Sequence, residues 1–158
     1  MRNKAEFLKL YGAIYEHSPW IAETAFEAQP GSLEALHAAM KAAVANASHE
    51  KKLALIKAHP ELGSKVKMAE ASVSEQKGAG LDQCTPQEFA EFKKLNAEYN
   101  KKFGFPFIIA VKGMTREDIL HAFRNRIGNG SAAEFEMALE QIHKIAWLRL
   151  SALGPVHF

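Results

Sequence analysis

Apolar residues along most of this chain recur every three or four positions, which is the spacing of one face of an α-helix. Strand-like alternation of apolar and polar residues is almost absent. Asn3 followed by Glu6 suits the start of a first helix, and Ser18 with Pro19 marks the start of a second. Two helices are therefore predicted before the break at Pro30 and the glycine after it.

Serine and threonine residues mark the starts of the later helices. Ser32 and Ser48 precede the next two periodic stretches, and the second of these must end near His59 because a proline follows it. The strongest start signal is Thr85-Pro86-Gln87-Glu88, which combines a hydroxyl cap, a proline in the first turn and a carboxylate that can bond back to the cap. It predicts a long helix that ends at Gly104.

The last two predicted helices begin at Thr115 and Ser131. In each case an acidic residue stands three positions later, Asp118 and Glu134 respectively, which is the spacing of a capping box. We expect the final helix to stop at residues 154–155, a Gly-Pro pair.

Two stretches do not follow the helical pattern. Residues 60–84 are polar and contain Gly63, Gly78 and Gly80, so a loop or a short broken helix is expected there. Residues 105–111 are apolar throughout and include Pro106, which disfavours both a helix and a central strand. The predicted fold is therefore all-α: a single-domain bundle of about seven or eight helices with one extended apolar segment at 105–111.

A buried extended segment without a neighbouring strand must direct its backbone N–H and C=O groups elsewhere. One possibility is that helix ends and water satisfy these groups at residues 105–109. The other is that a ligand with amide-like edges pairs with them. The sequence leaves both possibilities open.

Length and charge narrow the classes of function. The chain has 158 residues, which suits one core, and its formal net charge of +2 is too balanced for most nucleic-acid binders. Its single cysteine, Cys84, cannot form an intrachain disulfide and lacks a nearby base, so a thiol nucleophile is not expected. No apolar run approaches the length of a membrane helix or a secretory signal. We expect a cytoplasmic protein that binds neither membrane nor nucleic acid.

The seven histidines do not show the close spacing of a metal site. His59 differs from the others, because the predicted helix end and the following proline both constrain its direction. It suits either a helix C-cap or a catalytic imidazole.

Two further regions suit a polar ligand. Residues 72–76 supply hydroxyl, carboxylate and amide groups, and in a helix Ser72, Glu75 and Gln76 would share one face. A capped surface turn is the alternative interpretation. Arg149 carries the group best matched to a carboxylate, although an arginine in a helix is more often solvated.

Four motifs occur in order along the chain: His59-Pro60-Glu61-Leu62-Gly63; residues 72–76 with Ala79-Gly80-Leu81; residues 95–108, which include Asn96, Tyr99 and Gly104-Phe105-Pro106-Phe107-Ile108; and Arg149-Leu150. Together they resemble the OHCU decarboxylase family. These enzymes act on 2-oxo-4-hydroxy-4-carboxy-5-ureidoimidazoline (OHCU) in urate breakdown.

The resemblance implies an all-α enzyme, usually a homodimer, that uses no cofactor or metal and converts OHCU to (S)-allantoin and carbon dioxide. It implies one family domain over residues 1–158 and a small-molecule substrate as the ligand. The last three residues do not form a Ser-Lys-Leu peroxisomal signal, so a bacterial, cytoplasmic member is expected.

The resemblance also assigns roles to residues of this chain. The catalytic histidine falls on His59 and the catalytic carboxylate on Glu75. Substrate contacts fall on the following residues: Pro60, Ser72, Gln76, Phe105, Phe107, Ile108, Ile109 and Arg149.

Two other classes of function remain to be compared with this one. A non-catalytic helical interaction module would use His59 as a cap and residues 105–111 as a docking segment. A metal-assisted hydrolase would use the scattered histidines.

Overall fold

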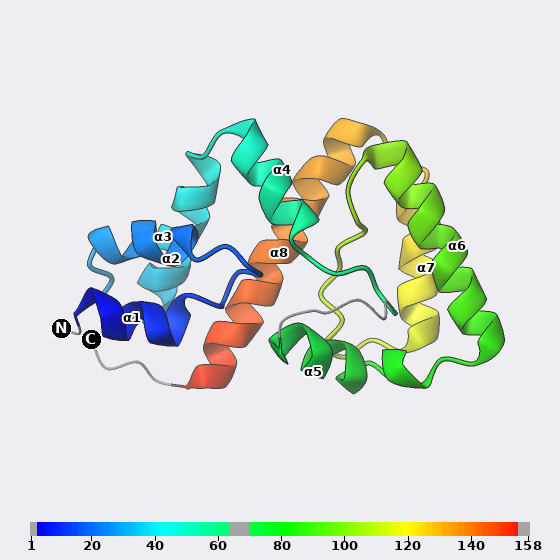
Figure 1. Cartoon of the computed structure of the whole chain (residues 1–158), viewed down its shortest axis with the longest axis horizontal. Helices are drawn as coiled ribbons and strands as arrows, with labels where there is room; N and C mark the ends of the chain where they lie inside the picture. Colours follow the sequence, from blue (N-terminus) through cyan, green and yellow to red (C-terminus); the bar gives the residue numbers. More distant parts are fainter. Residues whose placement is uncertain (1–2, 64–69, 155–158) are drawn as a thin grey trace. The chain divides into compact units, whose positions relative to one another are not determined.

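The computed structural model describes residues 3–63 and 70–154, with the side chains of 70–72 also outside the description. Over these residues the chain forms eight α-helices and one 3-10 turn, and no strand (Figure 1). The all-α prediction is therefore confirmed. The elements are α1 (Lys4–Tyr11), α2 (Trp20–Glu27), α3 (Leu33–Ala45), α4 (His49–Lys57), α5 (Glu70–Gly78), η1 (Leu81–Gln83), α6 (Pro86–Phe103), α7 (Arg116–Arg126) and α8 (Ser131–Leu153).

The helices group into two compact units. Within the described residues, unit 1 comprises 3–58 and 143–154, and unit 2 comprises 59–63 and 70–142. Helix α8 contributes residues to both units. The single domain over residues 1–158 stays a prediction.

Unit 1 contains α1 to α4 and the C-terminal part of α8. Helix α2 packs against both α1 and α3. The core is apolar and almost fully excluded from solvent, because each helix turns a stripe of large side chains inward. It includes Phe7, Ile21, Leu36, Met40 and Leu55.

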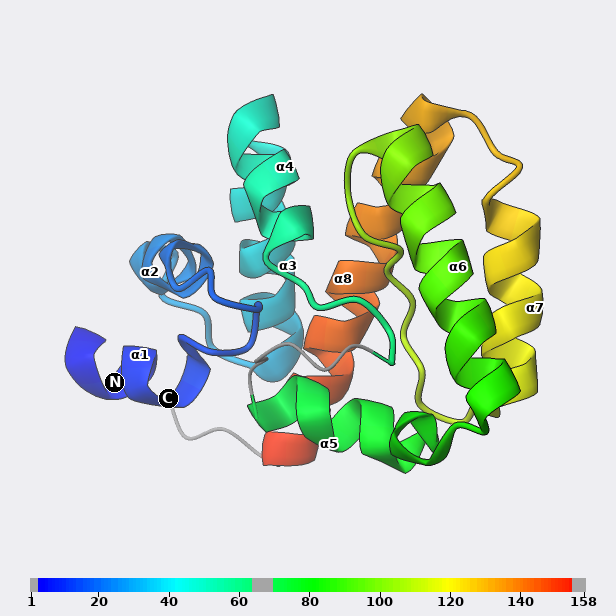
Figure 2. The same cartoon turned by 45° about the vertical axis from the view of Figure 1, so that its right-hand side comes forward.

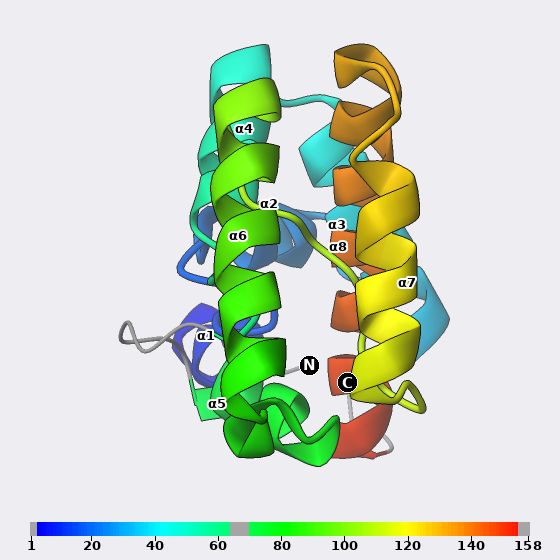
Figure 3. The same ribbon diagram turned by 90° about the vertical axis from the view of Figure 1, so that its right-hand side faces the viewer.

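Unit 2 contains α5, η1, α6, α7 and the first part of α8. Helices α6 and α7 pack side by side (Figures 2 and 3). Their core is aromatic: Tyr99 contacts the rings of Phe105, Phe107 and Phe123, and Phe107 stacks on Phe123 with ring centroids 3.9 Å apart. Such ring pairs contribute about 0.5–1.5 kcal/mol each beyond their burial.

Most predicted helix starts are confirmed by their caps. Side chains of Asn3, Ser32 and Ser48 accept hydrogen bonds from backbone N–H groups three residues later. Thr85 and Thr115 form complete capping boxes with Glu88 and Asp118. Gly104 ends α6 in the left-handed conformation, at φ 77°.

The predicted capping box at the start of α8 is wrong. Ser131 is the first helical residue rather than the cap, and the backbone N–H of Glu134 bonds to the carbonyl of Gly130. The Glu134 carboxylate is fully buried and bonds to Tyr99 and Arg126. The spacing of Ser131 and Glu134 in the sequence could not reveal that the Glu134 carboxylate bonds to buried side chains of other helices.

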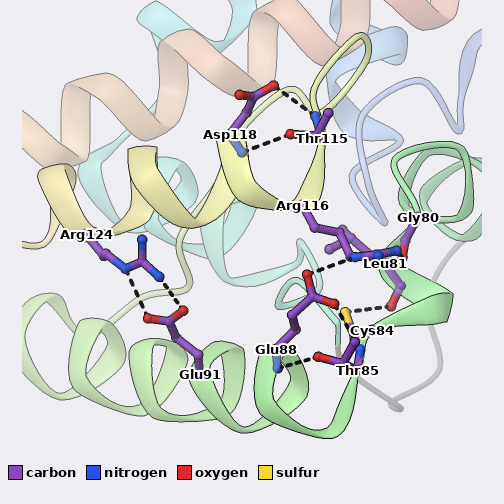
Figure 4. Close-up of polar contacts among 10 residues, drawn as sticks. All are labelled: Gly80, Leu81, Cys84, Thr85, Glu88, Glu91, Thr115, Arg116, Asp118 and Arg124. Carbon is purple, nitrogen blue, oxygen red and sulfur yellow. Dashed lines mark hydrogen bonds and ion pairs between the residues drawn. The ribbon is translucent and has the colours of Figure 1, made fainter.

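Arg116 joins three elements of unit 2 (Figure 4). From the first turn of α7 it donates to Glu88 at the start of α6, at 3.1 Å, and to the carbonyl of Gly80 before η1, at 3.0 Å. The Thr85 backbone N–H and the Arg116 guanidinium together lower the pKa of Glu88 from its ordinary value. Farther along, Arg124 of α7 pairs with Glu91 of α6 (Figure 4).

The segment at 105–111 lies outside the helices and runs back along α6 toward the start of α7 (Figures 1 and 3). All its residues are buried except Ile109, which is half-buried. The prediction of a buried, non-helical apolar segment is confirmed. The region at 60–84 contains α5 and η1, in agreement with the expected short broken helix.

Candidate active site

His59 begins a short segment of residues 59–63, which lies outside the helices. Helix α4 ends at Lys57, so His59 lies two residues beyond its last helical residue, and Pro60 follows it. The His59 side chain is only 7% exposed. Burial fits an aimed imidazole better than a solvated C-cap.

Gln76 of α5 holds this segment by two hydrogen bonds. Its Oε1 accepts from the backbone N–H of Gly63 at 3.0 Å, and its Nε2 donates to the carbonyl of Glu61 at 3.4 Å. Gly63 has φ +69°, a conformation that favours glycine. The Gln76 amide, predicted to contact substrate, therefore also attaches the His59 segment to α5.

Glu75 is the neighbour of Gln76 on α5 and is half-buried. Since α5 is helical from Glu70 to Gly78, the backbone positions of Ser72, Glu75 and Gln76 lie on one face, as expected. The side chain of Ser72 lies outside the described residues. The structure thus brings the helix that carries Glu75 against the segment that begins with His59.

Asn96 of α6 is a third anchor of this region, and sequence reasoning gave it no role. Its Nδ2 donates to the carbonyl of Leu62 at 3.0 Å. The side chain is 6% exposed, and its Oδ1 has no hydrogen-bond partner among the described residues. The available signal was a polar residue on the apolar stripe of α6 between Phe92 and Tyr99.

The predicted contact segment, residues 105–109, is held by side chains of other helices. Arg126 of α7 donates from Nη1 to the carbonyl of Ile108 at 2.6 Å, and just beyond the segment the N–H of Ala110 donates to Gln141 Oε1 of α8 at 3.0 Å. Side chains, rather than helix ends, therefore satisfy the Ile108 carbonyl and the Ala110 N–H. Sequence reasoning did not single out Arg126 or Gln141.

Arg126 belongs to a buried polar network in unit 2. Its Nε donates to Glu134 Oε1 at 3.0 Å, and the Tyr99 hydroxyl donates to the same oxygen at 2.6 Å. Burial, followed by the hydrogen bond to Glu134, raises the pKa of Tyr99 well above its ordinary value, so Tyr99 remains a donor. Asn129 supplies the other carboxylate oxygen with a hydrogen bond at 3.0 Å.

Arg149 lies in unit 1 and is buried rather than solvated, at 8% exposed. Its Nη1 donates to the carbonyl of Ile14 at 3.0 Å and to Glu16 Oε1 at 3.3 Å. The commoner expectation for a helical arginine is therefore wrong here. Glu16, which is fully buried, compensates its charge.

A second polar cluster in unit 1 contains two histidines. The Tyr15 hydroxyl lies 2.7 Å from His143 Nδ1, and His37 Nε2 lies 2.9 Å from the His143 carbonyl. Burial lowers the pKa of His143 to about 4 and raises the pKa of Tyr15. His143 is therefore neutral at pH 7, and the ring tautomer decides whether its Nδ1 accepts from the Tyr15 hydroxyl or donates to it.

Three other features lie apart from the predicted site residues. A surface cavity of about 360 Å³ lies in unit 1, and its lining includes Trp20 and Lys51. None of the predicted site residues lines it. Burial raises the pKa of the Cys84 thiol, whose Sγ lies 3.4 Å from the carbonyl of Leu81, in line with an unreactive cysteine. Over the described ranges, 3–63 and 70–154, no group of three or more potential metal ligands occurs.

No helix in the described part of the chain combines the length and the apolar character needed to cross a bilayer. The fold and the site region define an all-helical protein in which a buried histidine segment is attached to a carboxylate-bearing helix. The family model "OHCU decarboxylase" matches residues 2–151. The chain belongs to the OHCU decarboxylase family.

Named relatives agree with this membership. The chain is 44% identical over 146 residues to the 2-oxo-4-hydroxy-4-carboxy-5-ureidoimidazoline decarboxylase of Haloferax volcanii, covering 92% of this chain and 87% of the relative. It is 47% identical over 141 residues to the uric acid degradation bifunctional protein PucL of Bacillus subtilis, covering 89% of this chain and 28% of that longer protein.

Solved structures share the fold. A crystal structure of OHCU decarboxylase in the presence of (S)-allantoin superposes with a TM-score of 0.74 at 25% identity, covering 96% of this chain and 98% of the other. A crystal structure of (S)-allantoin synthase gives a TM-score of 0.77 at 36% identity, covering 96% and 50%.

Proposed function

We propose that this chain decarboxylates OHCU to (S)-allantoin and carbon dioxide in urate degradation, without a cofactor. Family membership over residues 2–151 supports the activity, which is that of a carboxy-lyase. The structural observation that carries the proposal is local to unit 2. The buried His59 segment is hydrogen-bonded to α5 through Gln76, the neighbour of Glu75.

The reaction needs proton control more than an electron sink. When the bond to the carboxylate breaks, the ring C=N of OHCU can take up its electron pair, so no pyridoxal or thiamine group is required. The hydroxyl then loses its proton and becomes a carbonyl, while the ring nitrogen and the ureido-bearing carbon each gain one. The face on which that carbon is protonated sets the handedness of allantoin.

His59 is the proposed proton-exchange group. An imidazole exchanges protons near neutral pH, and a buried ring between a helix end and a proline is held in a defined direction. We assign it the exchange with the substrate hydroxyl or ring.

Glu75 is the proposed partner of His59 in the reaction. Its carboxylate would hydrogen-bond the substrate and bias its protonation. On the same face of α5, Ser72 and Gln76 are proposed substrate contacts. Gln76 can bind both the backbone of residues 59–63 and the substrate, because an amide has two N–H donors and an oxygen with two acceptor sites.

Pro60 and the segment at 105–109 are proposed to form walls of the site. Pro60 is half-buried beside His59, and Phe105, Phe107 and Ile108 are buried. Peptide groups of Phe105, Phe107 and Ile109 match the amide-like edges of the ureido group and ring. The carbonyl of Ile108 already accepts from Arg126, so Ile108 is proposed to contribute its side chain to the wall of the site.

Arg149 is proposed to anchor an anionic or carbonyl group of the substrate. Its support is the family resemblance together with its buried position beside Glu16 in unit 1. Because Glu16 already compensates the guanidinium charge, a neutral carbonyl is the better-matched partner. A homodimer and a cytoplasmic location complete the proposal.

The decisive experiment follows circular dichroism of fresh urate treated with urate oxidase and hydroxyisourate hydrolase, with and without this protein and with a chelator. The proposal predicts rapid formation of optically active allantoin that survives chelation. An interaction module would leave the signal unchanged, and a metal-assisted hydrolase would lose activity with the chelator.

A further inference from the structure

Two polar side chains hold alternate peptide groups of the segment at 105–111. Arg126 Nη1 binds the carbonyl of Ile108 at 2.6 Å, and Gln141 Oε1 accepts from the N–H of Ala110 at 3.0 Å. In an extended chain the N–H and C=O of one residue point to the same side, and those of the next residue point to the opposite side. Two hydrogen bonds two residues apart therefore place the Ile108 carbonyl and the Ala110 N–H on the same side of this stretch.

By the alternation of an extended chain, we infer that the peptide groups of Phe107 and Ile109 face the opposite side. Phe107 is 1% exposed, and the described residues provide no hydrogen bond to the backbone groups of Phe107 or Ile109. Buried backbone groups in native proteins are almost always paired. The peptide groups of buried Phe107 and half-buried Ile109, which have no hydrogen bond within the described residues, are suited to bind a ligand.

The Arg126 tether is held rigidly. Glu134 and Tyr99, both fully buried, fix the guanidinium through Glu134 Oε1, and the guanidinium carbon lies 4.4 Å from the centroid of the Phe107 ring. Its Nη2 has no hydrogen-bond partner in the described ranges. A buried ion pair is a weak source of stability compared with apolar packing, so its use here favours a role in fixing geometry.

Gln141 is the second tether and the less buried one. It lies on α8 with a half-buried side chain, and its Nε2 is 3.8 Å from the sulfur of Met137. Among the described residues, its side chain makes one hydrogen bond to the backbone, from the N–H of Ala110. A change at Gln141 therefore alters the orientation of the segment with little effect on the buried core.

We propose that Gln141, acting with Arg126, is a positioning residue for the reaction. By holding the Ala110 and Ile108 peptide groups on one side, the pair turns those of Phe107 and Ile109 toward the N–H and C=O groups of the ureido substrate. This inference rests on the proposed decarboxylase activity, and it concerns residues that do not themselves touch substrate.

The test compares Q141M, which keeps the side-chain length but lacks the acceptor, with Q141E, which keeps an acceptor oxygen. Q87M on the exposed start of α6 is the matched control. Loss of one hydrogen bond that positions a binding group predicts a KM for OHCU about 3- to 10-fold higher in Q141M. The kcat should stay within about twofold. Q141E and Q87M should keep the KM of the unmodified protein.

The possible outcomes separate this inference from the proposed function. If the unmodified protein forms no optically active allantoin, the decarboxylase proposal itself fails. If the unmodified protein is active and Q141M keeps its KM, Gln141 is not a positioning residue, even if the melting temperature falls. A raised KM that Q141E does not rescue also overturns the inference.

Discussion

At the scale of single residues, two buried amide side chains near the predicted site bind other parts of the chain. Gln76 binds the backbone of residues 61 and 63, and Asn96 binds that of Leu62. A glutamine or asparagine that holds a loop can still present its remaining hydrogen-bonding capacity to a ligand. Substrate contact and loop anchoring are thus compatible roles for one side chain.

Arg149 allows stability and substrate binding to be separated. Arg149→Ala leaves Glu16 buried without its cation, so we expect the free energy of unfolding to fall by about 3 kcal/mol. Arg149→Lys keeps the charge and should retain most of that stability. If Arg149 anchors the substrate, both variants raise KM, because an ammonium cannot reproduce the planar guanidinium fork.

Urea denaturation and steady-state kinetics measure these two effects, and Glu16→Gln serves as the control for the ion pair. An unchanged KM in the folded lysine variant would show that Arg149 has a structural role alone.

At the scale of elements, helix starts could be read from the sequence because capping is local. Asn3, Ser32, Ser48, Thr85 and Thr115 each bond to a backbone group three residues away, so a short stretch of sequence contains the whole interaction. The capping box predicted at the start of α8 is wrong because Glu134 bonds instead to Tyr99, 35 positions away. Local spacing contains no information about such a partner.

The capping box of α6 offers a test at this scale. Thr85→Ala removes the acceptor for the Glu88 N–H, and we expect a loss of about 1 kcal/mol in the free energy of unfolding. Thr85→Ser keeps the hydroxyl and should be nearly neutral. Chemical denaturation measures both variants, and kcat should not change in either. Equal stability of T85A and the unmodified protein would contradict the capping account.

At the scale of the whole molecule, a buried ion pair occurs in each unit among the described residues, Arg149–Glu16 in unit 1 and Arg126–Glu134 in unit 2. The first joins residues 133 positions apart. Periodicity predicted the apolar core and the fold class well, but a buried arginine in a helix has the same sequence pattern as a solvated one. The predicted site residues could be named from the sequence and given roles by the family motifs, whereas the roles of Arg126, Gln141 and Asn96 required the structure.

The Tyr15–His143 pair links global stability to pH. The pKa of His143 is lowered from 6.5 to about 4 in the folded protein, mainly by burial. Between these values the unfolded chain binds a proton that the folded protein does not, so stability falls as the pH falls from about 6.5 to about 4. After allowance for the partial exposure of His143, we expect its protonation to lower the free energy of unfolding by about 2 kcal/mol.

His143→Gln keeps both a donor and an acceptor for the Tyr15 hydroxyl but does not titrate. The difference in unfolding free energy between this variant and the unmodified protein should therefore change by about that amount between pH 7 and pH 4.5. Urea denaturation at the two pH values measures it. Parallel pH dependence in both proteins would show that His143 is not buried as a neutral ring.

The central claim is that His59 and Glu75 act on the same substrate in one catalytic step. The most direct measurement is a double-mutant cycle of kcat/KM with freshly made OHCU, using His59→Asn, Glu75→Gln and the double variant. We expect each single variant to lose about 10²- to 10⁴-fold, and the double variant to lose little more than the worse single one. Losses that multiply, or a single variant that keeps full activity, would contradict the claim.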